Sequence, residues 1–228
     1  MAHAFRHLSG FLALAAALLA PALRAAEAPP VHFTVFAARP VQSLGFSPAP
    51  RAAAEKIVFY PTARSPRYEF RGAMPIRFAE TTSGALVAQA TIPPEIREAL
   101  LLFVPLGPPA KSGLRYQIAV LDDSAARHGA GGLAIINLSG LALSGTIGSQ
   151  AVTLISGLNP TLPVGRSARI VLRATMKNRS YQSYAETLQL GAKERALLIL
   201  FPPFYRGSLE VQSRLLIDEP PGPPPAPK

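Results

Sequence analysis

The sequence predicts an all-β fold built from two tandem immunoglobulin-like antiparallel β-sandwich units. Its 24 prolines and 17 glycines lie largely between short apolar runs, a pattern typical of short strands joined by turns. The apolar run ALLLFVP at 99–105 returns as ALLILFP at 196–202. After each copy comes a glycine turn and a strand that ends in two acids. This repeat indicates a duplicated β unit.

Each unit offers about the number of strands that an immunoglobulin-like sandwich needs. In the first unit the expected strands are 31–37, 41–46, 56–60, 67–71, 75–80, 85–91, 100–104 and 114–121. In the second unit they are 133–138, 141–147, 151–155, 168–175, 182–190, 196–201 and 209–217. The run 114–121 alternates apolar and polar residues, as a strand with one buried face requires. Gly148-Ser149 is expected to form a tight hairpin turn.

The two units are expected to span 29–125 and 126–219, joined by the glycine-rich stretch 124–132. In the repeat alignment Phe33 matches Ile135, Ala99 matches Ala196, and Asp122 matches Asp218. An alternative remains open, in which both repeats interlock into one larger sandwich. The proline-rich segment 220–228 cannot join a sheet and is expected to be an extended tail.

The N-terminal segment 1–25 reads as a secretory signal peptide. It combines Arg6, an apolar stretch at 8–19, and Pro21 followed by small residues. Cleavage is expected between 22 and 28, which places the mature chain in the periplasm or outside the cell. No later segment reaches transmembrane length without a charge. Cysteine is absent, so no disulfide holds the fold, and a bacterial envelope protein is the expected class.

The formal net charge of +10 favours anionic partners. For an exported chain these are envelope components such as lipid head groups or acidic glycans, and nucleic acid is excluded. The expected partner is an unidentified envelope protein or an anionic surface polymer.

No recognisable catalytic or metal-binding motif is present. The chain has no Gly-x-Ser-x-Gly elbow, and only His32 and His128 remain after the expected cleavage. His128 is expected to be a solvated linker residue. The paired acids at 122–123 and 218–219 are expected to meet solvent or a turn at strand ends, and neither a metal nor a cofactor is predicted.

One stretch of the second unit predicts a binding surface. If 168–179 continues as a strand, its cations share one face, opposite an apolar face. The candidate anion-binding residues are Arg166, Arg169, Arg173, Lys177 and Arg179. A solvated edge strand that is protected from aggregation by its charges is the alternative interpretation.

The order of elements resembles that of a known class. A signal peptide, short strands, Asn137-Leu-Ser139 opening a strand and the run 196–202 are similar to uncharacterised exported proteins of Gram-negative bacteria with immunoglobulin-like sandwiches. The resemblance implies a fold and a location and supplies no catalytic residues. We therefore expect a non-enzymatic envelope protein with a binding or scaffolding role. The alternative is recognition of an anionic glycan or lipid by the basic strand, and an exported hydrolase is ranked third.

Overall fold

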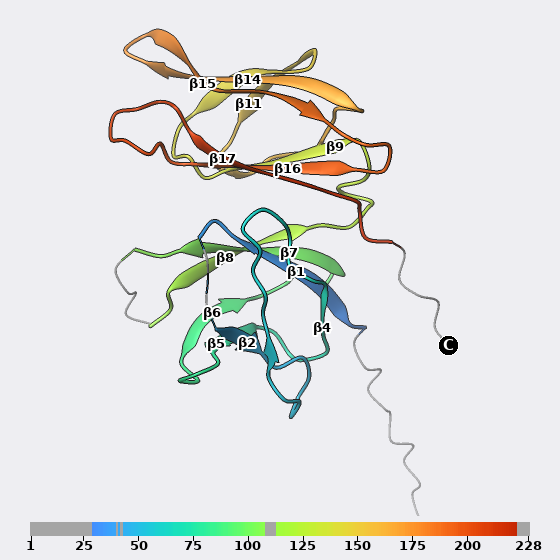
Figure 1. Cartoon of the computed structure of the whole chain (residues 1–228). Helices are drawn as coiled ribbons and strands as arrows, with labels where there is room; N and C mark the ends of the chain where they lie inside the picture. Colours follow the sequence, from blue (N-terminus) through green and yellow to red (C-terminus); the bar gives the residue numbers. More distant parts are fainter. Residues whose placement is uncertain (1–28, 40, 42, 108–112, 223–228) are drawn as a thin grey trace, which may run out of the picture.

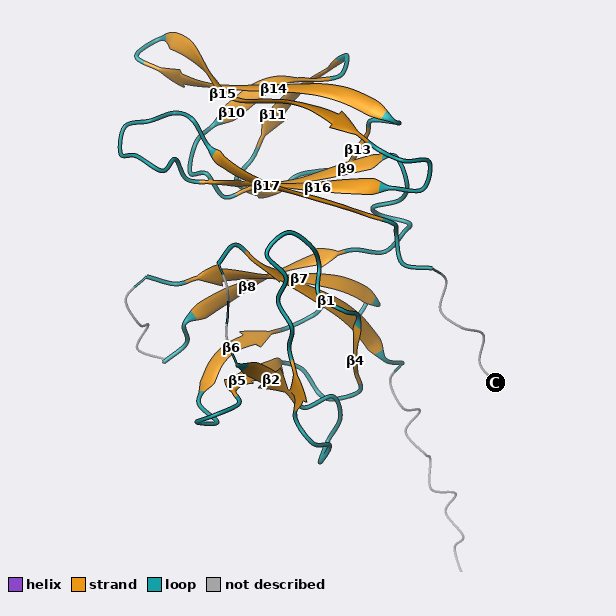
Figure 2. Cartoon of the chain, viewed as in Figure 1, coloured by secondary structure: helices purple, strands orange, loops and turns teal. Residues whose placement is uncertain are grey.

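The structure is a computed structural model that describes residues 29–39, 41, 43–107 and 113–222. These residues form strands and loops and include no helix (Figure 2). The expected all-β class is confirmed. The proposed signal peptide, its cleavage site and most of the proline-rich tail lie outside the described residues.

In the described part of the chain, seventeen strands form four sheets. Sheet A contains β4 (Tyr68–Phe70), β1 (Val31–Ala37), β7 (Glu98–Pro105) and β8 (Tyr116–Asp122). Sheet B contains β3 (Glu55–Lys56), β2 (Leu44–Phe46), β5 (Ile76–Glu80) and β6 (Leu86–Ala90). Sheet C contains β12 (Gly157–Leu158), β9 (Gly132–Asn137), β16 (Arg195–Phe201) and β17 (Gln212–Asp218), with β13 (Leu162–Pro163) also on β9. Sheet D contains β11 (Gln150–Leu154), β10 (Leu143–Ile147), β14 (Ser167–Met176) and β15 (Arg179–Gln189).

The sheets stack in the order B, A, C, D (Figure 1). One apolar cluster, rich in phenylalanine, lies between sheets A and B, which we call unit 1. A second apolar cluster, rich in leucine and isoleucine, lies between sheets C and D, which we call unit 2. A third cluster joins side chains of sheet A to side chains of sheet C, so the two units pack face to face. Assignment of these units to the immunoglobulin-like class, and their exact limits, remain predictions.

The repeated apolar runs are the central strands β7 and β16. In β7, Leu101 faces the core of unit 1 while Leu100 and Leu102 face sheet C. In β16, Leu198 faces the core of unit 2 while Ile199 faces sheet A. A strand that is buried on both faces needs a continuous apolar run rather than an alternating one. Burial of both faces of β7 and of β16 therefore explains why the same apolar run occurs twice in the sequence.

Strand pairing corrects the expected repeat alignment at both ends. Phe33 pairs with Ala99 in parallel, and Leu133 pairs with Ala196 in the same way, so Phe33 corresponds to Leu133 and not to Ile135. Beside these strands, Ala99 pairs with Asp122, whereas Ala196 pairs with Ile217. The structural counterpart of Asp218 is consequently Asp123.

Candidate functional site

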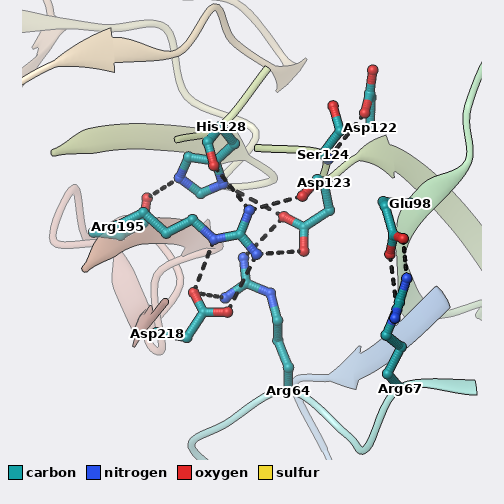
Figure 3. Close-up of polar contacts among 10 residues, drawn as sticks. Arg64, Arg67, Glu98, Asp122, Asp123, Ser124, His128, Arg195 and Asp218 are labelled. Carbon is teal, nitrogen blue, oxygen red and sulfur yellow. Dashed lines mark hydrogen bonds and ion pairs between the residues drawn. The ribbon is translucent and has the colours of Figure 1, made fainter. Parts of the chain in front are cut away.

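A buried arginine lies where the two units meet. Arg195 begins β16 and is only 1 % exposed. Its Nη1 donates to the main-chain oxygens of Asp123 (2.8 Å) and His128 (2.9 Å). Its Nη2 donates to carboxylate oxygens of Asp123 (2.9 Å) and Asp218 (3.3 Å), and its Nε donates to Asp218 at 3.2 Å (Figure 3). A guanidinium has five N–H donors, and all five are bonded here.

A second arginine reaches the same carboxylates from unit 1. Arg64 donates from Nη1 to Asp218 (2.6 Å) and from Nη2 to Asp123 (3.2 Å). Asp123 follows β8 of unit 1, whereas Arg195 and Asp218 belong to sheet C of unit 2. We call Arg64, Asp123, Arg195 and Asp218 the ion cluster. Within it, Arg64 of unit 1 bonds Asp218 of unit 2, and Arg195 of unit 2 bonds Asp123 of unit 1. The cluster pairs two positive with two negative charges, and ions shielded from water need such pairing.

The pKa of Asp123 reflects this setting. Burial by itself raises the pKa of a carboxyl group, but the contact with His128 and the charges of Arg64 and Arg195 outweigh it. The pKa of Asp123 is therefore lowered, and the carboxylate is held in its charged form. Asp123 is 5 % exposed, so of the two settings expected for the strand-end acids, solvent or a turn, solvent does not apply to Asp123.

His128 is also buried, with 3 % exposure, and the expectation of a solvated linker histidine is wrong. Its Nε2 lies 2.9 Å from the carbonyl oxygen of Ala196, and its Nδ1 lies 3.5 Å from Asp123 (Figure 3). In a hydrolytic triad the nitrogen opposite the carboxylate would face a nucleophile. Here it faces a main-chain carbonyl of β16, so His128 fastens the junction segment to sheet C. Within the described ranges, no cluster of three or more histidine or acidic residues is arranged to hold a metal ion.

Two cavities flank the ion cluster. The first has a volume of about 350 Å³ and is lined by Arg64, Arg67 and Thr34 among others. Arg64 Nε and Thr34 Oγ1 are buried there without a hydrogen-bond partner among the described atoms. The second, of about 590 Å³, lies on the side of His128 and Asp122. Arginines and carboxylates line the first cavity together, so its charges largely compensate one another.

The structure brings together only part of the predicted basic row. Arg169 and Arg173 lie on the outward face of β14, opposite Thr187 and Gln182 of β15. The strand ends at Met176, and Lys177 with Asn178 forms the hairpin turn, with φ values of 50° and 61°.

The remaining two predicted residues also lie off the row. Arg179 pairs with Met176, and because cross-strand partners share a face, it lies on the side opposite Arg173. Arg166 lies in the turn before β14. Alternation fails after Met176 because the turn interrupts the strand.

The ion cluster was not identified from the sequence. Arg64 is separated from Asp218 by 154 positions, and no local pattern marks Arg64. The only signal was the acid at the end of each repeat, which strand pairing now aligns as Asp123 and Asp218.

No helix in the part of the chain that the structure describes has the length and apolar character needed to cross a bilayer. Comparison of the chain with models of known protein families and with the sequences of curated proteins finds no match.

Proposed function

We propose that the chain is an exported, non-enzymatic envelope protein whose two units act as one rigid scaffold for a partner. The observation that carries this proposal is the junction between the units. Apolar side chains of sheets A and C pack across it, and the ion cluster ties Arg64 of unit 1 to Asp218 of unit 2. Two units joined only by a linker would be free to reorient, whereas a packed and bonded junction fixes the relative position of their outer faces.

The scaffold proposal is tested on the protein itself. The full chain is expressed in a Gram-negative host, and the product in the periplasm or medium is identified by N-terminal sequencing. We expect a mature start between residues 22 and 29. Small-angle X-ray scattering of that product should fit one fixed arrangement of the two units. A full-length product confined to the cytoplasm, or scattering that requires independently moving units, would contradict the proposal.

Recognition of an anionic glycan or lipid head group by sheet D is a second candidate. It is supported by the residues that sheet D directs away from the core of unit 2. All residues of its strands β10, β11, β14 and β15 are described by the structure. Strand register places Arg169 and Arg173 there beside hydroxyl and amide residues, and no carboxylate occupies an outward position. Val171 and Ala185 lie between the two arginines on this face, but two cations with hydroxyl and amide neighbours and no opposing carboxylate suit an acidic polymer.

Retention on heparin resin tests this candidate. Replacing both Arg169 and Arg173 by Ser should lower the salt concentration of elution. A matched control replaces Arg39 and Arg77, two exposed arginines of unit 1, by Ser. Equal shifts for the two double variants would show that only total charge matters, and the sheet D candidate would be rejected.

A further inference from the structure

The end of unit 2 that lies far from the ion cluster gathers exposed apolar side chains. Strand register defines this end. In sheet D, Leu143 pairs with Ala174 and with Leu154, and in sheet C, Phe201 pairs with Gln212. The short connection 138–142 joins the end of β9 to the start of β10. The connections 138–142, 155–156, 177–178 and 202–211 therefore emerge at one end, which we call the loop end (Figure 1).

Two of these connections, and the strand ends beside a third, present large apolar groups to solvent. Phe204 and Tyr205 are 75 % and 72 % exposed. Their rings pack edge to face, with the ring centroids 4.9 Å apart. Ile155 is 61 % exposed on the connection after β11. Met176 and Tyr181, beside the β14–β15 turn, are 41 % and 40 % exposed. Exposed apolar groups that gather in one place mark an interaction surface rather than the ordinary scatter of surface residues.

The charge at the loop end is mainly positive. Lys177 lies in the β14–β15 turn, Arg179 follows that turn, and Arg206 follows the aromatic pair. Within these described segments, Glu210 is the single carboxylate. The hairpin and the β16–β17 loop are held next to each other, because Val211 N–H donates to Ser183 C=O at 3.1 Å. Apolar and cationic side chains are thus presented together.

We propose that the loop end is a docking surface for an anionic phospholipid membrane. Aromatic and aliphatic side chains on separate loop tips enter the head-group region, while lysine and arginine beside them contact lipid phosphates. The apolar groups named here line neither of the two cavities described above, and they lie on connections and strand ends at one end of the unit, which suits a planar surface better than a small ligand. The proposal rests on the proposed function only in requiring export, since an exported chain meets the lipid.

Sedimentation with vesicles tests this surface. The probes are vesicles of phosphatidylcholine alone and of phosphatidylcholine mixed with phosphatidylglycerol. Wild-type protein should sediment with the mixed vesicles, and less so at high salt. Replacing both Phe204 and Tyr205 by Ser should weaken this binding at least about tenfold, because two large apolar side chains no longer leave water. Both side chains are exposed, so the melting temperature should not change.

The matched control removes exposed apolar groups of unit 1, Val58 and Tyr60, by changing both to Ser. Its binding should equal that of wild type. Unchanged binding by the Phe204/Tyr205 variant would overturn the proposal. So would loss of binding only when Arg169 and Arg173 are changed, which would assign the lipid to sheet D.

Failure of wild-type protein to bind either vesicle would also overturn the proposal. All variants share the same N-terminus, so these comparisons are independent of whether the chain is exported. A failure here is therefore distinct from a failure of the export test.

Discussion

At one end of unit 2 an arginine is buried with all its donors bonded, and at the other end two aromatic rings lie open to solvent. Arg195 is 1 % exposed, whereas Phe204 is 75 % exposed, although Arg195 begins β16 and Phe204 follows closely after the end of the same strand. A buried charge is tolerated only when every donor finds an acceptor, and an exposed ring contributes little to folding. The junction end therefore holds the protein together, while the side chains of the loop end are not needed for folding and are free to bind a partner.

The largest effect is expected at the junction. Arg195→Ala leaves Asp123 and Asp218 facing each other with one buried cation fewer. Breaking a buried ion pair from one side typically costs about 3–5 kcal/mol, and we expect that loss in the free energy of unfolding. Urea denaturation followed by circular dichroism measures it.

Two further variants sharpen this result. Arg195→Lys keeps the charge but loses the planar fork, so its loss should be smaller than that of Arg195→Ala. Arg173→Ala removes an exposed arginine of sheet D and should change the free energy of unfolding by less than about 0.5 kcal/mol. Similar losses for Arg195→Ala and Arg173→Ala would show that the ion cluster does not stabilise the fold.

The next effect concerns acid stability. The folded-state pKa of Asp123 lies below the ordinary value of 3.8. The Asp123 carboxylate therefore makes its full contribution to the free energy of unfolding at pH values above 3.8. The contribution disappears as the pH falls through the lowered folded pKa. Stability of the wild type should thus fall more steeply between pH 5 and pH 2 than that of Asp123→Asn. Urea denaturation across this range provides the comparison, and parallel curves would contradict it.

The smallest effect on stability is expected at the loop end. Changing both Phe204 and Tyr205 to Ser should alter the free energy of unfolding by less than about 0.5 kcal/mol, even though vesicle binding falls. Arg195→Lys should show the reverse, with reduced stability and unchanged vesicle binding at temperatures where it is folded. If both variants lost binding equally, the division between the two ends would not hold.

The sequence predicted strands where local composition decides the backbone. The runs that became β7 and β16 were identified because a continuous apolar stretch bounded by turns has few other solutions. The turn at Gly148-Ser149 was also predicted, and Ile147 pairs with Gln150 across it. The two-residue strands β12 and β13 were not predicted, because one is only Gly-Leu and the other ends in Pro163.

The site could be predicted only in part, for two physical reasons. Alternation gave the correct outward positions for Arg169 and Arg173, but the Lys177-Asn178 turn reversed the chain before Arg179. Burial of Asp123 and His128 depends on Arg64 and Arg195, which are distant in the sequence. When an ion-pair partner is brought close only by the tertiary fold, the local sequence pattern does not reveal the pair.

A double-mutant cycle between Arg64 and Asp218 measures how strongly the ion cluster joins the two units, because this pair links unit 1 to unit 2 at 2.6 Å. Arg64→Ala, Asp218→Ala and the double variant are compared with the wild type by urea denaturation. If the ion cluster holds the units together, the coupling free energy between the two side chains should be at least about 1 kcal/mol. A coupling below about 0.3 kcal/mol would mean that the bond across the junction does not hold the units together.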